Sequence, residues 1–257
     1  MAAKTVYRMI STRISPMVEL TRWLFERQGL AYREAAHAPG LHVLATLTAK
    51  GGVEVPVIVT PDGKVWKTAW DILTGLDAAG SPGRRLFGEY EAERAANQAF
   101  VESLLTGLLT DAPRHVYHAL LPFKSLAYPT ATHRAPGWER AFVWALYPVW
   151  RGMMARSLGF APAQLDQAPA RITAALVLVE TELVRRGSPF LGGAAPGVLD
   201  IVFSALAAPL VFPPNHGARL PPFEALPPTL KAFVTATRAR PAGALVLRTY
   251  DAARAYD

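Results

Sequence analysis

A serine followed by a proline is the first place in this chain where chemistry is expected. Ser15-Pro16 stands at the start of a helical pattern, with serine at the N-cap position and proline in the first turn. The unpaired N–H groups and the partial positive charge of such a helix end stabilise an anion. A ligand thiol held there would have its pKa lowered, and its thiolate would accept a hydrogen bond from the hydroxyl. Two alternatives stay open: Ser15 only caps the helix, or the nearby hydroxyl of Ser11 or Thr12 takes the chemical role.

The chain contains no cysteine, so the sulfur of any such reaction has to come from a cosubstrate. Disulfides, thiolate metal sites, iron–sulfur clusters and a cysteine nucleophile are excluded for the same reason. His115 and His118 are three residues apart and His133 follows, but no acidic residue stands at the usual ligand spacing. We therefore expect no metal.

The composition predicts a folded protein with a large apolar core. Of the 257 residues, 51% are hydrophobic and 18% are charged, which excludes an intrinsically disordered chain. The net charge is +7, but the basic residues are scattered and not interleaved with aromatic residues on one element, so we expect no nucleic-acid partner. The N-terminus lacks a secretory signal, and no clean apolar run reaches the roughly 20 residues of a membrane span. These features predict a cytoplasmic protein without a membrane partner.

Short strand and helix signals alternate in the N-terminal part of the chain. Strands are expected at 5–10, 30–35, 55–60 and 64–67, and helices from 16 to a stop at Gly29, weakly at 41–48, and from 69 onward. A proline opening a strand, as in Val55-Pro56, leaves main-chain groups of the preceding residue facing outward, although an edge strand without a ligand has the same pattern. One crossover and one hairpin predict a mixed sheet.

The composition changes at 80–83, Gly-Ser-Pro-Gly, which we interpret as part of a linker. Beyond it the periodicity is helical. Helices are expected at about 89–111, 114–127, 138–159, 168–187, 198–212, 228–239 and 242–254. We predict a first domain at 1–80, a linker at 81–88 and an all-α domain at 89–257.

Four segments, in this order along the chain, resemble the glutathione transferase (GST) superfamily. They are Ser15-Pro16 with the helix that contains Arg22; 55–59 (Val-Pro-Val-Ile-Val); 62–65 (Asp-Gly-Lys-Val) with 68–73 (Thr-Ala-Trp-Asp-Ile-Leu); and 197–201 (Gly-Val-Leu-Asp-Ile). The last is similar to the family's capping motif, in which Asp200 reaches back to the amide of Gly197. The resemblance implies a thioredoxin-like N-terminal domain with a mixed four-stranded sheet, followed by the all-helical GST C-terminal domain.

The resemblance also implies a glutathione transferase-like enzyme with glutathione as cosubstrate. Ser15 would stabilise the glutathione thiolate, which would attack a hydrophobic electrophile held by the helical domain. Val55 and Pro56, joined by a cis peptide bond, would present main-chain groups that pair with the tripeptide backbone. Aromatic residues of the helical domain are candidates to line the electrophile pocket, namely Tyr117, Phe123, Tyr128, Trp138 and Trp144. The family further implies a homodimer.

Two places differ from the family's pattern. Thr68 and Ala69 stand where an acidic residue and a serine usually bind the γ-glutamyl end of glutathione. Glu54 precedes the Val-Pro pair, where some classes carry a basic residue for the glycyl carboxylate. The basic residues expected to take over that role are Lys50, Lys67 or Arg13. These differences favour an alternative function: a non-catalytic GST-fold binding or interaction protein, similar to the metaxins, that has lost glutathione binding.

Overall fold

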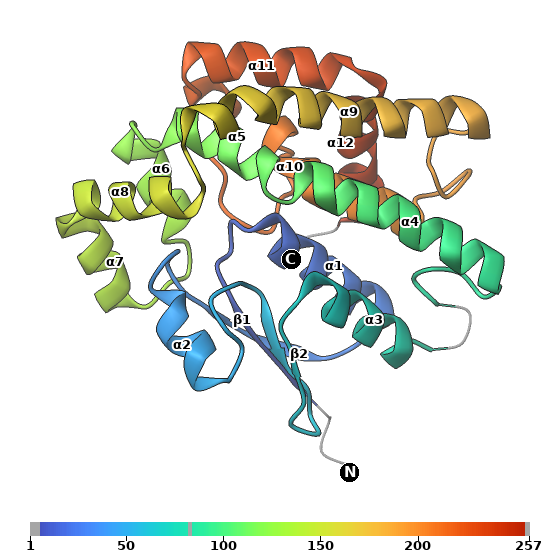
Figure 1. Ribbon diagram of the computed structural model, residues 1–257, viewed down its shortest axis with the longest axis horizontal. Coiled ribbons are helices and arrows are strands. Elements are labelled where there is room, and N and C mark those ends of the chain that lie inside the picture. The colour runs from blue at the N-terminus through green and yellow to red at the C-terminus, as the bar shows by residue number, and fades with distance from the viewer. Residues whose placement is uncertain (1–5, 82–83, 255–257) are drawn as a thin grey trace.

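The computed structural model describes residues 6–81 and 84–254. A thioredoxin-like unit of sheet and helices lies on one side of the molecule, and helices make up the rest (Figure 1). The elements of the first unit are β1 (Tyr7–Ser11), α1 (Pro16–Gln28), β2 (Tyr32–Ala36), α2 (His42–Thr48), β3 (Val57–Val59), β4 (Val65–Trp66) and α3 (Ala69–Ala79). The predicted alternation of strands and helices is therefore confirmed, while Thr5 of the expected first strand lies outside the described residues.

The sheet has four strands in the order β2-β1-β3-β4. β1 and β2 are parallel, with Tyr7 opposite Tyr32, because α1 carries the chain back across the sheet. β3 is antiparallel to β1 and to β4, so the predicted mixed sheet is confirmed. The β3–β4 turn closes through a hydrogen bond from the Thr60 amide to the Lys64 carbonyl, with Gly63 at a φ of 85° that favours glycine.

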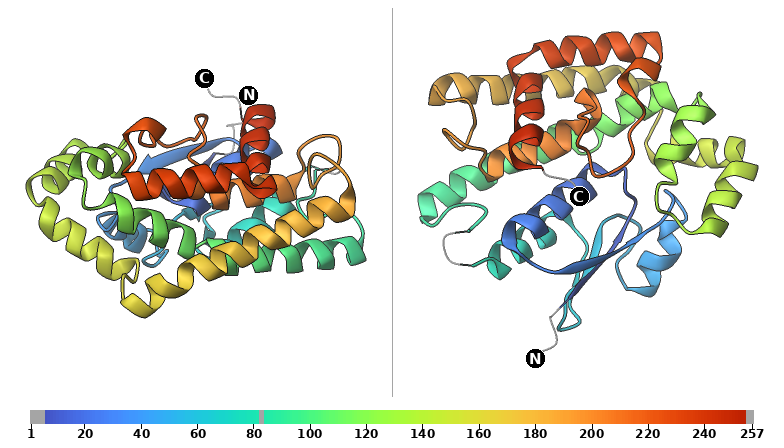
Figure 2. Two further views of the ribbon diagram at one scale, coloured as in Figure 1. Left: turned by 90° about the horizontal axis from the view of Figure 1, so that it is seen from above. Right: turned by 180° about the vertical axis from the view of Figure 1, so that it is seen from behind.

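Nine α-helices and one short 3₁₀ helix follow within residues 84–254. They are α4 (Glu91–Leu108), α5 (Asp111–Leu120), α6 (Lys124–Ala131), α7 (Gly137–Ala145), α8 (Tyr147–Ser157), α9 (Pro162–Arg186), α10 (Val198–Val211), η1 (Phe223–Ala225), α11 (Pro228–Ala239) and α12 (Pro241–Ala253). α10 lies between the sheet unit and the outer helices α9 and α11, and the α7–α8 pair projects at one end (Figures 1 and 2). None of the described helices is long and apolar enough to cross a membrane.

Three predicted helix boundaries were wrong, and prolines explain each difference. The helix expected at 114–127 is two helices, α5 and α6, because Pro122 has no N–H group to continue the hydrogen bonds of α5. The helix expected at 138–159 breaks at Leu146, and Pro148 then stands in the first turn of α8. α9 begins at Pro162, six residues before the predicted start at 168, because proline is also favoured in a first helical turn.

The fully buried helix α10 anchors the helical part to α1. Asp200 accepts hydrogen bonds from the amides of Gly197 and Gly192, both at 2.8 Å, and of Leu191 at 2.7 Å. The predicted contact between Asp200 and the Gly197 amide is thus confirmed. Burial raises the pKa of Asp200, although these three amides act in the opposite direction. The predicted linker at 81–88 includes residues 82–83, which lie outside the described residues.

Candidate functional site

An open pocket of about 590 Å³ lies where the sheet unit meets α5 and α8. On the sheet side it is lined by the β1–α1 loop, the loops on both sides of α2, and the start of α3. On the helical side, the lining comes from the end of α4 with α5, and from the last two turns of α8. Because the chain's own side chains leave this space empty, it has room for a small ligand.

Ser15 lines this pocket and is half-buried. It occupies the N-cap position of α1, as predicted, but its side chain makes no capping hydrogen bond, and its hydroxyl has no partner among the described residues. Thr12 also lines the pocket. Ser11 does not, because its buried hydroxyl donates a hydrogen bond to Glu34 at 2.5 Å. Of the three candidate hydroxyls, Ser15 and Thr12 remain placed for chemistry.

Val55 and Pro56 lie on the pocket wall, and the peptide bond between them is cis, as the resemblance implied. β3 begins only at Val57, so the Val55 amide and carbonyl belong to no strand pairing. No hydrogen bond joins either group to another described residue. An extended ligand in the pocket would therefore find one free donor and one free acceptor on the same residue.

The start of α3 meets the pocket through Ala69, whereas Thr68 is exposed and outside the lining. Thr68 and Asp71 form a reciprocal cap: the Asp71 amide donates to the Thr68 hydroxyl, and the Thr68 amide donates to Asp71, both at 3.0 Å. The Lys67 amide donates to the same carboxylate at 3.2 Å. Asp71 is therefore engaged with the helix start, and Ala69 brings only main-chain groups to the pocket.

Only some of the charged residues expected to contact a ligand lie at the pocket. Glu54 and Lys67 are exposed and both line the pocket. Lys50 is exposed too, but it is not among the lining residues. Arg13 is buried and also outside the lining, and its guanidinium donates a hydrogen bond to the Gly217 carbonyl. Of the three predicted basic residues, Lys67 is the one at the pocket.

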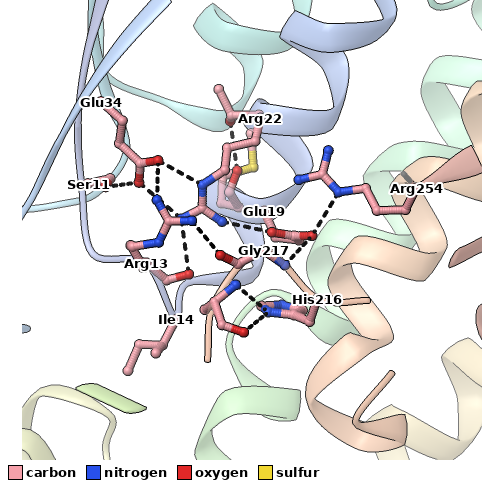
Figure 3. A network of polar contacts seen from close by, with 12 residues as sticks. Ser11, Arg13, Ile14, Glu19, Arg22, Glu34, His216, Gly217 and Arg254 are labelled. Carbon is pink, nitrogen blue, oxygen red and sulfur yellow. Dashed lines mark hydrogen bonds and ion pairs between the residues drawn. The ribbon is translucent and has the colours of Figure 1, made fainter. Parts of the chain in front are cut away.

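A buried network of charged side chains holds the loop that carries Ser15 (Figure 3). Glu34 of β2 accepts two hydrogen bonds from Arg22 of α1, both at 3.0 Å, and one from Arg13 at 2.8 Å, besides that from Ser11. Burial alone would raise the pKa of Glu34, but the hydrogen bonds and positive charge of Arg22, with Ser11 and Arg13, lower it. Glu34 is therefore an anion at neutral pH that joins β1, β2 and α1.

The same network continues to the C-terminal part of the chain through Glu19 of α1. This carboxylate accepts hydrogen bonds from Arg22 at 2.7 Å and from the Gly217 amide at 3.2 Å, and it lies 3.4 Å from Nε of Arg254. Burial would raise its pKa, but the charges of His216, Arg254 and Arg22 lower the pKa of Glu19 to about 2. Sequence reasoning missed this network, whose local signal is a pair of opposite charges three residues apart, Glu19 and Arg22, within the mostly apolar segment 16–25.

Two more side chains fix the pocket loops. The buried Tyr117 hydroxyl donates to the carbonyl of Ile14, next to Ser15, at 2.9 Å, and burial raises the pKa of Tyr117. His42 accepts a hydrogen bond from the Gly40 amide at Nδ1, at 3.0 Å. Nε2 of the same ring lies 2.9 Å from the Val53 carbonyl, which requires a proton on Nε2. Burial lowers the pKa of His42, so a neutral imidazole joins the two loops.

The helical wall of the pocket differs from the prediction. Of the five aromatic residues expected there, Tyr117 lines the pocket, whereas Phe123, Trp138 and Trp144 are exposed elsewhere. Tyr128 packs against a separate core cluster. The wall of α8 consists of Met153, Met154, Ser157 and Leu158 instead. The breaks at Pro122 and Leu146 set new directions for the helices, which a single continuous helical pattern could not predict.

Hydrogen bonds fasten this wall to the sheet unit. Glu139 of α7 is fully buried, and its carboxylate lies 2.6 Å from Nδ1 of His37 and 2.6 Å from the Ala38 amide. The Trp150 indole donates to the Pro39 carbonyl at 2.8 Å. The α7–α8 pair is therefore attached to the 37–40 loop by its inner face.

Two of the three histidines considered as metal ligands contact aromatic rings. His115 lies 4.4 Å from the ring of Phe233, and His118 lies 5.1 Å from that of Phe160, measured between ring centroids. Within residues 6–81 and 84–254, no three His, Asp or Glu side chains group as metal ligands.

Comparison with known proteins finds similarity in structure but not in sequence. No protein-family model and no curated protein matches this chain. Solved structures do: a glutathione S-transferase from Xanthobacter autotrophicus is 17% identical with a TM-score of 0.58, covering 97% of this chain and 95% of that one. The chain has the glutathione S-transferase fold. This finding confirms the fold class that the four sequence segments implied.

Two further GST structures are similar over nearly their whole length. One, from Rhodospirillum rubrum, is 19% identical with a TM-score of 0.53 and covers 94% of this chain and 91% of that one. The other, a theta class GST from Xanthomonas axonopodis pv. citri with glutathione bound, is 18% identical with a TM-score of 0.52. It covers 98% of this chain and 99% of that one. At these identities the similarity establishes the GST fold of this chain.

Proposed function

We propose that this chain is a glutathione transferase-like enzyme that binds glutathione, or a closely related thiol, in the 590 Å³ pocket. The observation that carries the proposal is one juxtaposition. The Ser15 hydroxyl, without a protein partner, and the unpaired main chain of Val55 line the same open space. Glutathione bound to a GST of the same fold supports this choice of ligand.

In the proposed reaction, the Ser15 hydroxyl donates a hydrogen bond to the thiolate of the bound cosubstrate. The N-terminus of α1 adds a partial positive charge, and both effects favour loss of the thiol proton to solvent. The thiolate then attacks an electrophilic carbon, so that a carbon–sulfur bond forms and the leaving group departs with its electron pair. Met153, Met154 and Leu158 provide an apolar wall for such an electrophile.

The peptide part of the ligand would pair with the Val55 amide and carbonyl and lie against Pro56, as an added strand would. The main-chain N–H of Ala69, with Lys67 beside it, would receive a carboxylate at the start of α3. Thr68 acts indirectly in this proposal, because its cap with Asp71 fixes that helix start. The role predicted for Lys50 remains a prediction, as do the homodimer and the cytoplasmic location.

A second candidate function is a non-catalytic GST-fold binding protein. It is favoured by Glu54, which brings a negative charge to the pocket, and by Ala69, which has no hydroxyl for a ligand. Loss of one charge-assisted hydrogen bond costs about 1.5–3 kcal/mol, or roughly tenfold or more in affinity. The two candidates therefore differ in whether glutathione binds at millimolar concentration.

Calorimetric titration with glutathione tests binding, and reaction with a chlorodinitrobenzene electrophile tests catalysis. We expect Ser15→Ala to lower kcat/KM about 10- to 100-fold, because the thiolate loses one charge-assisted hydrogen bond. The pH profile should move upward by about one to two units, since the bound thiol then ionises less readily. Ser157→Ala is the matched control, because Ser157 lines the same pocket from α8.

Each outcome decides between the candidates. Absence of binding at millimolar glutathione would remove the enzyme proposal and leave the binding protein. If the thiol binds but Ser15→Ala reacts as fast as the parent protein, Thr12→Val is the variant that should slow the reaction. Equal losses for Ser15→Ala and Ser157→Ala would indicate a general disturbance of the pocket.

A further inference from the structure

The α7–α8 pair presents an unusual amount of apolar surface to solvent. Its exposed large apolar side chains are Trp138, Phe142, Trp144, Leu146, Val149 and Met153. We call these residues the α7–α8 surface. Trp144 is 60% exposed and Val149 is 67% exposed, so neither is a core residue only partly covered. Exposed apolar side chains gathered on two consecutive helices mark a contact with another molecule or with a membrane.

Loose packing does not explain this exposure, because the inner face of the pair is firmly attached. Glu139 and Trp150 bond to the 37–40 loop, and the Tyr147 hydroxyl donates to the Leu121 carbonyl at 2.9 Å. Val143 and Trp150 are almost fully buried. The inner face of these helices thus packs against the rest of the protein, and their outer apolar face is exposed to solvent.

Within residues 112–165, which include α7 and α8, the exposed charges are all of one sign. Glu139 is the one acidic residue within 112–165, a range that the structure describes throughout, and it is buried. Exposed basic residues in the same range are Lys124, Arg134, Arg140, Arg151 and Arg156. Three of them, Arg140, Arg151 and Arg156, lie on α7 and α8 themselves. No exposed carboxylate within this range offsets them.

We propose that the α7–α8 surface binds the face of an anionic lipid bilayer. Exposed tryptophan, phenylalanine and leucine next to arginine suit the boundary between acyl chains and headgroups, where apolar groups are buried and arginines meet phosphates. The net charge of +7 adds attraction at longer range. A second copy of the chain fits less well, because a two-fold contact through this surface would bring like charges together. Nucleic acid would leave the aliphatic Leu146 and Val149 without a favourable contact.

The α7–α8 surface adjoins the pocket, so a bilayer bound to this surface would lie beside the ligand site. Met153 belongs to the exposed surface and also lines the pocket, and α2 borders the pocket nearby with the exposed Leu44 and Leu47. A molecule dissolved in the bilayer would therefore reach the pocket beside the contact. If the proposed transferase function holds, the electrophile is one that partitions into lipid. Binding to the bilayer itself does not depend on that function.

This proposal replaces the sequence-based expectation that no membrane is involved. That expectation rested on the lack of a spanning segment, and a protein that lies on a bilayer needs none. It also gives a role to Trp138 and Trp144, which the sequence placed in the pocket.

Co-sedimentation with lipid vesicles tests the proposal. We expect the full chain to bind vesicles of equal parts phosphatidylglycerol and phosphatidylcholine, and to bind phosphatidylcholine alone at least about tenfold less. Binding should weaken with salt, and tryptophan fluorescence should shift to the blue as Trp138 and Trp144 leave water. Absence of binding to the anionic vesicles would overturn the proposal.

Two valine variants make the test specific. Val149→Asp should reduce vesicle binding about tenfold or more, whereas Val184→Asp, at an 83% exposed position on the far end of α9, should leave it unchanged (Figure 1). Arg151→Gln should reduce binding about fivefold. Circular dichroism confirms that each variant is folded, and glutathione titration of Val149→Asp in solution keeps this test separate from the thiol site.

Other results would contradict the proposal in different ways. Equal losses for the two valine variants would indicate a general charge effect. A dimer of the parent protein that Val149→Asp converts to a monomer would assign the surface to a second copy. Binding to duplex or single-stranded nucleic acid that Val149→Asp abolishes, without vesicle binding, would assign it to that partner.

Discussion

The loop that carries Ser15 and the α7–α8 pair both border the pocket. The charged side chains around the loop are buried, whereas those on α7–α8 are exposed to solvent. Around the loop, Arg22 and Glu34 are buried or nearly so and bond to each other. On α7–α8, Arg140 and Arg151 face solvent, and neither helix carries an exposed acidic residue. Buried charges of the first kind fix one geometry, whereas exposed charges of the second kind are available to a partner.

The largest effect on stability is expected at Glu19. Glu19→Gln removes the carboxylate that Arg22 and Arg254 share, so these buried positive charges lose one of the anions that balance them. The free energy of unfolding at neutral pH should fall by about 3–5 kcal/mol, as measured by urea titration. Glu224→Gln is the control, because Glu224 forms an ion pair with Lys231 but is exposed, and its loss should cost less than about 1 kcal/mol. Similar losses for both variants would contradict the comparison.

The pH dependence of stability should show the same carboxylate. The pKa of Glu19 is about 2 in the folded chain and 4.5 as its ordinary value, so between these values the unfolded chain binds more protons. Stability from this group is therefore fully present above about pH 4.5 and is lost as the pH falls toward 2. The difference amounts to about 3 kcal/mol, and Glu34, with its lowered pKa, acts in the same direction. Urea titrations across this range should give a flatter profile for Glu19→Gln, and an identical profile would contradict the assignment.

The smallest effect on stability is expected on α7–α8. Arg151→Gln should change the free energy of unfolding by no more than about 0.5 kcal/mol, because the side chain is exposed and has no ion-pair partner among the described residues. Urea titration at neutral pH measures this change beside that of Glu19→Gln. A loss of several kcal/mol would mean that the outer arginines also hold the fold, and the difference between the two regions would disappear.

Features set by a few neighbouring residues could be predicted from the sequence. Pro16 and Gly29 mark the ends of α1 because each acts on its own backbone, and Asp200 caps α10 from three residues away. Val55-Pro56 and the segment after Thr68 were placed correctly by their order along the chain, which sufficed for the fold.

Features that depend on distant parts of the chain could not be predicted in this way. Glu19 meets the Gly217 amide across 198 residues, and no local pattern specifies that contact. Ser11 and Ser15 are both serines close to the start of α1, so the sequence does not distinguish them. In the structure the Ser11 hydroxyl donates a hydrogen bond to Glu34, whereas Ser15 lines the pocket. Trp144 is of a residue type that often lines pockets, but the break at Leu146 places its side chain in solvent.

The hydrogen bond from the Ala38 amide to Glu139 crosses between the two walls of the pocket, at 2.6 Å, and both residues are fully buried. Its proton can exchange with deuterated water only when those walls come apart. The exchange rate of this single amide therefore reports the free energy of opening the pocket, and a tightly held ligand would slow it without touching Ala38.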